Sequence, residues 1–101
     1  VTTDVDQEMV ERMIARAREY VPGIDDLSVI RTWTGFRAAT QDSLPLIGPV
    51  PGRENLLLAC GHEGLGITTS LATGRLIADY VADRAFEIDA APYRPDRTIP
   101  A

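Results

Sequence analysis

The N-terminal segment places apolar and charged residues with a helical period. Apolar side chains recur at steps of three and four residues, at Val5, Met9, Val10, Met13, Ile14, Ala17 and Val21. Acidic residues and arginines fill the positions between them, which is typical of a helix with one apolar face and one solvated face. We predict that Thr3 or Asp4 caps this helix and that Val21-Pro22-Gly23 ends it. Its predicted role is packing.

A second pattern, rich in β-branched and aromatic residues, runs from Leu27 to Ala38 and predicts a long strand. Side chains would alternate between two faces, and neither face is purely apolar. Gly35 lies within the run, where a glycine often marks a bulge or the close approach of a ligand or another backbone. Arg37 would lie on the same face of the strand as Gly35. From the pattern alone, Arg37 is either an ordinary solvated or ion-paired arginine or a binding residue.

The run from Asn55 to Cys60 is mostly apolar and predicts a strand that is buried on both faces. It follows turn-forming residues at 40–45 and a short apolar piece at 46–49 that glycine and proline close. Cys60, at the end of the strand, fits a small core residue better than a nucleophile. One cysteine and one histidine, His62, form neither an internal disulfide nor a structural zinc site, so no metal site is expected.

A glycine-rich junction follows this strand, and its glycines are Gly61, Gly64 and Gly66. Helical periodicity then runs from Gly66 to Ala82, so the pattern predicts a strand, a glycine loop and a helix. Such a loop lets the backbone turn sharply and approach a ligand closely, while N–H groups at the helix start point outward. It suits a flat, electron-rich or anionic ligand, but the same pattern also occurs as a tight connection. It matches neither the G-x-G-x-x-G dinucleotide fingerprint nor a P-loop.

Small side chains lie four residues apart along the predicted helix, at Gly66, Ser70, Gly74 and Ala78. Because these positions form one row on a helix, we expect another backbone or a flat ligand to approach the helix there. Gly74 costs about 1 kcal/mol in helix propensity relative to alanine, and close packing would offset that cost. Beyond the helix, the proline-rich and charged run 89–97 is predicted to lie on the surface as a tail.

Length and composition narrow the class of protein. The 101 residues suffice for one domain with a modest core, and we expect a single domain over residues 1–101. Fifteen acidic and ten basic residues give a net charge of −5 without a basic, aromatic-rich cluster, which argues against nucleic-acid binding. No apolar run has the length of a membrane span and the first residues do not form a secretory signal. We therefore predict no transmembrane segment and a cytoplasmic location.

A set of short motifs occurs in a fixed order between Trp33 and Ala82. They are Trp33-Thr34-Gly35-Phe36-Arg37, Thr40-x-Asp42, Leu44-Pro45-Leu46-Ile47-Gly48-Pro49, Asn55-Leu56, Gly61-His62, Gly66-Ile67 and Ala72-Thr73-Gly74-Arg75-Leu76. In order and spacing they resemble the C-terminal portion of the FAD-dependent family that includes D-amino-acid oxidase, glycine oxidase, sarcosine oxidase and the D-amino-acid dehydrogenases. Each motif is short, and the combination is specific.

The resemblance implies both a fold and a set of site residues. The implied fold is α+β: a small domain with an N-terminal helix, antiparallel strands and a C-terminal helix after the glycine loop, within a larger two-domain flavoprotein. Arg37 matches the arginine that binds the substrate carboxylate in this family. The glycine loop matches the segment that lies against the pyrimidine edge of the flavin. The implied cofactor-binding residues are Gly61, His62, Glu63, Gly64, Leu65, Gly66, Ile67 and Thr68.

The activity implied by the resemblance is oxidation of an amino acid or secondary amine, such as a D-amino acid, glycine, sarcosine or a proline-like compound. In such enzymes a hydride passes from the substrate Cα to FAD and leaves an imine that hydrolyses. The cofactor carries this chemistry, and the protein supplies orientation and electrostatics. The substrate side chain and the electron acceptor stay open.

The family's fingerprint for the adenine and pyrophosphate of FAD belongs to the N-terminal half of the enzyme and does not occur in these residues. We therefore expect a C-terminal fragment or split subunit that is inactive alone. Its expected partners are the N-terminal FAD-binding half, or a separate subunit, and a small-molecule substrate. Two alternatives stay open: a non-catalytic binding or assembly subunit that retains this fold, and a stand-alone anion-binding α+β module.

Overall fold

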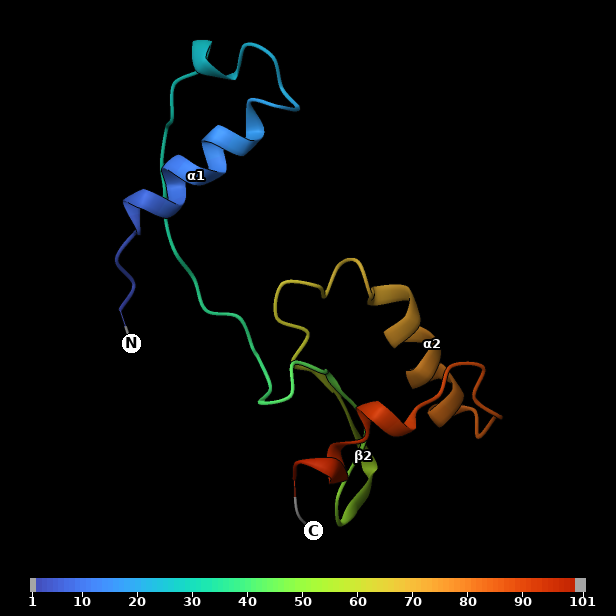
Figure 1. The fold of residues 1–101 in the computed structure, drawn as a ribbon. Coiled ribbons are helices and arrows are strands. Elements are labelled where there is room, and N and C mark those ends of the chain that lie inside the picture. The colour runs from blue at the N-terminus through green and yellow to red at the C-terminus, as the bar shows by residue number, and fades with distance from the viewer. Residues whose placement is uncertain (1, 100–101) are drawn as a thin grey trace. The chain divides into compact units, whose positions relative to one another are not determined.

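The computed structural model describes residues 2–99, which divide into two compact units. The first unit ends at Phe36 and the second begins at Arg37. The second unit combines a two-stranded antiparallel sheet with helix α2 (Ser70–Val81), which confirms the predicted α+β class (Figure 1). The single-domain organisation stays a prediction. Within residues 2–99, no helix has the length and apolar character that crossing a membrane requires.

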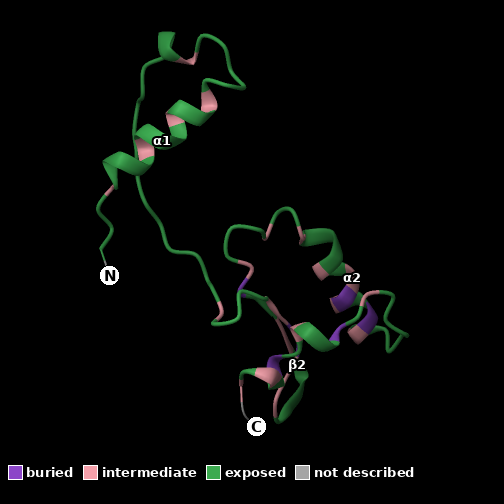
Figure 2. Cartoon of the chain, in the orientation of Figure 1, coloured by how far each residue is buried: buried purple, intermediate pink, exposed green. Residues whose placement is uncertain are grey.

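The first unit contains the predicted amphipathic helix, α1 (Gln7–Ala17). Its cap is Asp6, whose Oδ1 accepts a hydrogen bond from the backbone N–H three residues later at 3.1 Å. The prediction of Thr3 or Asp4 as the cap is wrong, because the Asp4 carboxylate accepts instead from the Thr2 hydroxyl at 2.7 Å. No residue of α1 is fully buried, and its apolar face is only partly covered, with Val10, Ile14 and Ala17 of intermediate exposure (Figure 2).

The predicted strand from Leu27 to Ala38 is wrong, because residues 28–38 have no regular secondary structure. A strand needs a neighbour to complete its backbone hydrogen bonds, and the sheet found among residues 2–99 consists of two other strands. The side chains that suggested a strand are exposed, Ile30 at 99% and Trp33 at 73%. Helix α1 also ends earlier than predicted, at Ala17, and turns follow it.

The second unit is built on a hairpin of β1 (Leu46–Val50) and β2 (Arg53–Cys60). The register places Ile47 opposite Ala59 and is irregular near the turn. The apolar piece at 46–49 is therefore part of a strand, and its glycine and proline do not close it. The prediction that β2 is buried on both faces is wrong, because the sheet has only two strands. β1 pairs with one edge of β2, and the rest of the unit can cover only one face of the hairpin. Most of β2 is exposed, and so is Cys60, which is not the predicted core residue.

A glycine inside β1 lets the hairpin approach helix α2. Gly48 has φ of +138°, and a Cβ on it would stand 2.9 Å from the Tyr80 hydroxyl oxygen and 3.3 Å from Pro95 Cδ. Any larger residue would therefore have to displace the Tyr80 ring or move β1 away from it.

The core lies where β1, α2 and the C-terminal segment meet (Figure 2). Its buried apolar residues are Ile47, Leu76 and Ala90. The prediction of a surface tail at 89–97 is wrong in part, because Ala90 and Pro95 are buried. Two short helical turns, Ala91–Tyr93 and Pro95–Arg97, carry this run along β1. Part of the run is therefore packed against the core.

Helix α2 begins at Ser70, later than the predicted start at Gly66, and residues 66–69 form turns. Of the predicted row of small residues, Ser70, Gly74 and Ala78 lie on the helix and Gly66 lies before it, and close packing against Gly74 is not seen. A Cβ on Gly74 would meet no atom of the described residues within 4 Å. Nothing in the described part of the chain therefore offsets the helix-propensity cost of this glycine.

Candidate functional site

The glycine loop starts with a glycine that the fold itself requires. Gly61 follows the last residue of β2 and has φ of +79°, which L side chains rarely adopt. A Cβ at this position would stand 2.7 Å from Thr40 Cγ2. The loop therefore leaves the hairpin in close contact with the turn that precedes β1.

The two later glycines of the loop have no such requirement within the chain. A Cβ on Gly64 would meet no atom of the described residues within 4 Å, and a Cβ on Gly66 would meet only His62 Cβ, at an ordinary 3.5 Å. Neither residue has a positive φ. The chain alone would accept alanine at both positions, so the absence of side chains there leaves open surface over the loop.

Backbone donors of the loop are free, and this is the loop's main chemical property. The N–H groups of Gly64, Gly66, Ile67 and Thr68 have no hydrogen-bond partner among residues 37–99. The Leu65 N–H differs, because it donates to the His62 carbonyl at 3.0 Å. One free donor, that of Gly64, therefore lies inside this turn, and the other three follow it.

Several carbonyls of the loop are, by contrast, already occupied. The Leu65 carbonyl accepts from the Thr69 N–H at 2.9 Å and from the Thr69 hydroxyl at 2.8 Å. The Ile67 carbonyl accepts from the Ser70 N–H at 3.3 Å and from the Ser70 hydroxyl at 2.8 Å. A loop with several free donors and several occupied acceptors favours an electron-rich or anionic ligand over a cation.

His62 ties the loop to helix α2. Its Nε2 lies 2.9 Å from Thr73 Oγ1, and both side chains are partly buried. A pocket of about 220 Å³ lies beside this contact, and its lining includes His62, Leu65, Thr69, Thr73, Leu76 and Tyr93. The imidazole therefore links the glycine loop to helix α2.

Arg37, the candidate substrate-binding residue, lies beside the loop. Its Nη1 donates a long hydrogen bond of 3.5 Å to the Glu63 carbonyl. The Glu63 N–H in turn donates to the Ala38 carbonyl at 2.9 Å. Arg37 is exposed and forms no ion pair with any acidic residue among those described. The predicted site residues Arg37 and 61–68 thus come together, and the guanidinium keeps most of its donors available.

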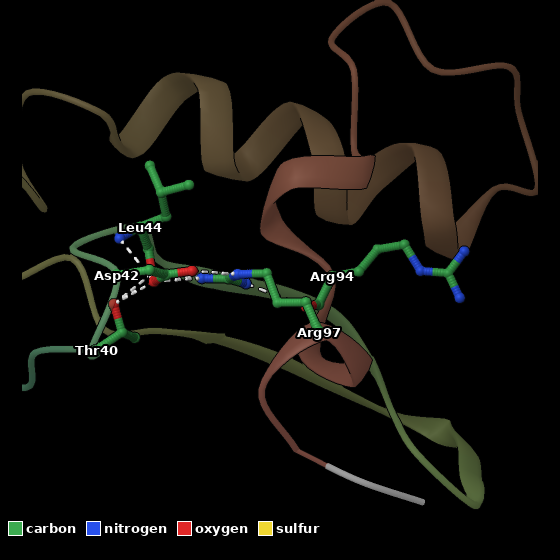
Figure 3. Close-up of polar contacts among 5 residues, drawn as sticks. All are labelled: Thr40, Asp42, Leu44, Arg94 and Arg97. Carbon is green, nitrogen blue, oxygen red and sulfur yellow. Dashed lines mark hydrogen bonds and ion pairs between the residues drawn. The ribbon is translucent and has the colours of Figure 1, made fainter.

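A turn between Arg37 and β1 has a polar network that sequence reasoning missed (Figure 3). Asp42 Oδ1 accepts from the Thr40 hydroxyl at 3.0 Å and from the Leu44 N–H at 3.1 Å. Arg97 donates to the same carboxylate from Nε, at 2.8 Å, and from Nη2, at 3.1 Å. The Arg97 hydrogen bonds, followed by the Leu44 N–H, hold the pKa of Asp42 well below its usual range. The Thr40-x-Asp42 spacing was the available signal, but nothing in it pointed to Arg97.

Comparison with known proteins gives the family. The family described as FAD dependent oxidoreductase (DAO) matches residues 1–80. A glycine oxidase from Pseudomonas aeruginosa is 39% identical over 88 residues, which are 87% of this chain and 24% of that protein. The hydrogen cyanide synthase subunit HcnC of the same organism is 38% identical over 87% of this chain and 21% of its own length.

A solved structure agrees with the sequence comparison. The crystal structure of glycine oxidase from Geobacillus kaustophilus matches with a TM-score of 0.73 and 36% identity, over 97% of this chain and 26% of that one. The chain thus spans about a quarter of the length of these relatives. By its family match and its fold, the chain belongs to the DAO family of FAD-dependent oxidoreductases.

Proposed function

We propose that this chain is the C-terminal part of an FAD-dependent enzyme that oxidises an amino acid or a secondary amine. The family match and the two named glycine oxidases support this reaction class. The observation that carries the proposal is the position of Arg37, whose Nη1 lies 3.5 Å from the Glu63 carbonyl of the glycine loop. One arginine without an acidic partner among the described residues thus borders a loop with free N–H donors.

The loop is suited to the flavin ring of FAD. The proposed contacts come from residues 61–68, with free N–H groups on Gly64, Gly66, Ile67 and Thr68. The open surface over Gly64 and Gly66 lets a flat ring approach the backbone. When bound, FAD supplies the acceptor for the hydride of the substrate, and that chemistry belongs to the cofactor. The loop donors stabilise negative charge at the edge of the ring that they face.

Arg37 binds and orients the substrate in this proposal. A guanidinium offers two parallel N–H donors to a carboxylate, and this geometry fixes the angle of the substrate as well as its position. Lysine is a point charge and does not fix that angle. The substrate class is therefore an amine that carries a carboxylate close to the reacting carbon.

The test compares substrates with and without the carboxylate in the full-length protein that contains this chain. Arg37→Ala should lower kcat/KM for the amino acid by about 100-fold or more, because truncating one partner of such a pair costs about 2–5 kcal/mol. Arg37→Lys should restore part of the binding and less of the rate. An analogous amine without the carboxylate should lose far less.

The matched control is Arg53→Ala, which removes another exposed arginine of the second unit, at the start of β2. This variant should keep both activities. Flavin content, measured from the visible absorption band, should be equal in all variants. Equal losses for the two substrates in Arg37→Ala, with flavin retained, would refute the carboxylate-binding role. A full-length protein that turns over no amine would favour the non-catalytic subunit.

A further inference from the structure

We propose that Arg97, through its ion pair with Asp42, is a positioning residue for Arg37 and the glycine loop. Arg97 does not contact the loop itself. It acts on the turn 40–44, which lies between Arg37 and strand β1. The inference rests on the proposed function for its catalytic consequence, but its structural part stands on contacts within the second unit.

The Arg97 guanidinium donates hydrogen bonds to three groups, the Asp42 carboxylate and the carbonyls of Leu44 and Arg94. Nε and Nη2 donate to the two carboxylate oxygens of Asp42 at 2.8 and 3.1 Å. Nη2 also donates to the Leu44 carbonyl at 2.7 Å, and Nη1 donates to the Arg94 carbonyl at 3.1 Å. Only 18% of the Arg97 side chain is exposed. Two parallel bonds to one carboxylate fix the orientation of both groups, which one exposed contact would not do.

The Asp42 carboxylate organises the turn to which Arg97 is bound. It accepts from the Thr40 hydroxyl and from the Leu44 N–H, and the Thr40 hydroxyl also contacts the Leu44 carbonyl at 2.7 Å. The turn is therefore stabilised by side-chain hydrogen bonds and not by the backbone hydrogen bonds of a sheet. Removing Arg97 leaves the carboxylate and the Leu44 carbonyl without their strongest donor.

The turn 40–44 and the residues just before it contact the glycine loop. Thr40 Cγ2 occupies the space beside Gly61, where a Cβ would stand 2.7 Å away. Two residues before Thr40, the Ala38 carbonyl accepts from the Glu63 N–H at 2.9 Å, and Arg37 Nη1 reaches the Glu63 carbonyl. The segment 37–44 thus contacts Arg97 near one end and the glycine loop near the other. It therefore connects Arg97 to the proposed substrate-binding and cofactor-binding groups.

A neighbouring arginine provides a matched control. Arg94 lies three residues before Arg97 and forms a local ion pair with Asp96, with Nε at 3.1 Å from Oδ1. Its side chain points away from Asp42, whereas that of Arg97 points toward it (Figure 3). Arg94→Ala thus removes one arginine and one ion pair from the same segment and leaves the turn intact.

The first test measures backbone hydrogen exchange in the full-length, FAD-loaded protein, with and without substrate. In Arg97→Ala, peptides covering 38–44 and 61–65 should exchange several-fold faster, and peptides of α2 should not change. Arg94→Ala should match the unmodified protein, and Arg97→Lys should lie between the two. Asp42→Asn is the second variant, because it keeps the side-chain volume and weakens the same pair. Unchanged exchange at 38–44 and 61–65 in both Arg97→Ala and Asp42→Asn would overturn the inference.

The second test is kinetic and separates this inference from the proposed function. Arg97→Ala should lower kcat/KM for the amino acid about tenfold or more, because small misplacements of a binding group are costly. Arg97→Ala added to Arg37→Ala should cause little further loss, since both changes act on one interaction. If Arg37→Ala has no effect but exchange still rises in Arg97→Ala, the carboxylate role fails and the positioning contact stands. Full additivity of the two kinetic losses would overturn the positioning role.

Discussion

Thr40 and Gly61 lie so close that only a glycine fits at residue 61. Thr40 Cγ2 is 2.7 Å from the point where a Cβ on Gly61 would stand, and φ of Gly61 is +79°. The start of the glycine loop is therefore fixed by the turn that follows Arg37. The turn that follows the substrate-binding candidate Arg37 thus contacts the first residue of the cofactor-binding candidate loop, although the two are far apart in sequence.

Gly61→Ala should destabilise the second unit, whereas Gly64→Ala should not. The Cβ at residue 61 must displace Thr40 and adopt an unfavourable φ, which together cost about 1–3 kcal/mol or more. At residue 64 a Cβ meets open space and an ordinary φ. Chemical denaturation of both variants measures the difference in free energy of unfolding. Equal stability of the two variants would show that Thr40 moves aside at no cost.

Gly66→Val should impair the cofactor and spare the fold. Within the chain, a Cβ at residue 66 meets only His62 Cβ at 3.5 Å, an ordinary contact, so we expect the fold to accept a side chain there. In the full-length protein the larger side chain would cover the N–H groups that we assign to the flavin. We expect loss of FAD, or flavin reduction slowed by about 100-fold or more. Flavin absorbance and stopped-flow reduction measure the two effects.

A neutral result at residue 66 would have a clear meaning. If Gly66→Val keeps its flavin content and its reduction rate, the loop is a tight connection between β2 and α2. The thermal midpoint of the variant serves as the control, because an unchanged midpoint assigns any flavin loss to the ligand side of the loop.

The 101-residue chain alone should bind FAD weakly or not at all. It spans about a quarter of its relatives' length, and its proposed cofactor contacts come from the single segment 61–68. Few contacts cannot offset the entropy of immobilising a large cofactor. Purification of the chain in the presence of FAD, followed by a visible absorption spectrum, checks this. A stoichiometric flavin band would contradict the expectation.

Asp42 should make the stability of the second unit depend on pH in the acid range. Its pKa is lowered in the folded state, chiefly by Arg97, so the folded state favours the ionised carboxylate. The stabilisation is fully present above the unfolded-state pKa of about 3.9 and is lost as the pH falls from there through the lower folded-state pKa. Arg97→Gln should therefore destabilise the chain most at neutral pH, and the difference should shrink toward low pH. Unfolding curves at several pH values, with Arg94→Gln as control, measure it.

Local patterns predicted the helices and the glycine loop from sequence because those features depend on neighbouring residues. Helix α1 follows from apolar residues at steps of three and four, and the loop follows from glycines between a strand and a helix. Free N–H groups were also expected ahead of the helix, and those of Gly66, Ile67 and Thr68 have no partner among residues 37–99. The family resemblance was confirmed by the match over residues 1–80.

Features that depend on distant partners were not predictable. Residues 27–38 have the composition of a strand, but composition does not supply the neighbouring strand that a ladder requires. The burial of Ala90 and Pro95 depends on β1, and the role of Arg97 depends on Asp42, 55 positions earlier. No periodicity records such contacts, so the positioning pair beside the candidate site was visible only in three dimensions.

The 55 positions between Asp42 and Arg97 also affect the order in which the chain acquires its structure during synthesis. Arg37, the turn 40–44 and the glycine loop all leave the ribosome before Arg97 does. Until then the Asp42 carboxylate has only its local partners, Thr40 and Leu44, and the turn is held at one end alone. The last ordering contact of the candidate site therefore forms only when the C-terminal segment packs along β1, so a nascent chain stalled before Arg97 would carry every proposed binding group without its final alignment.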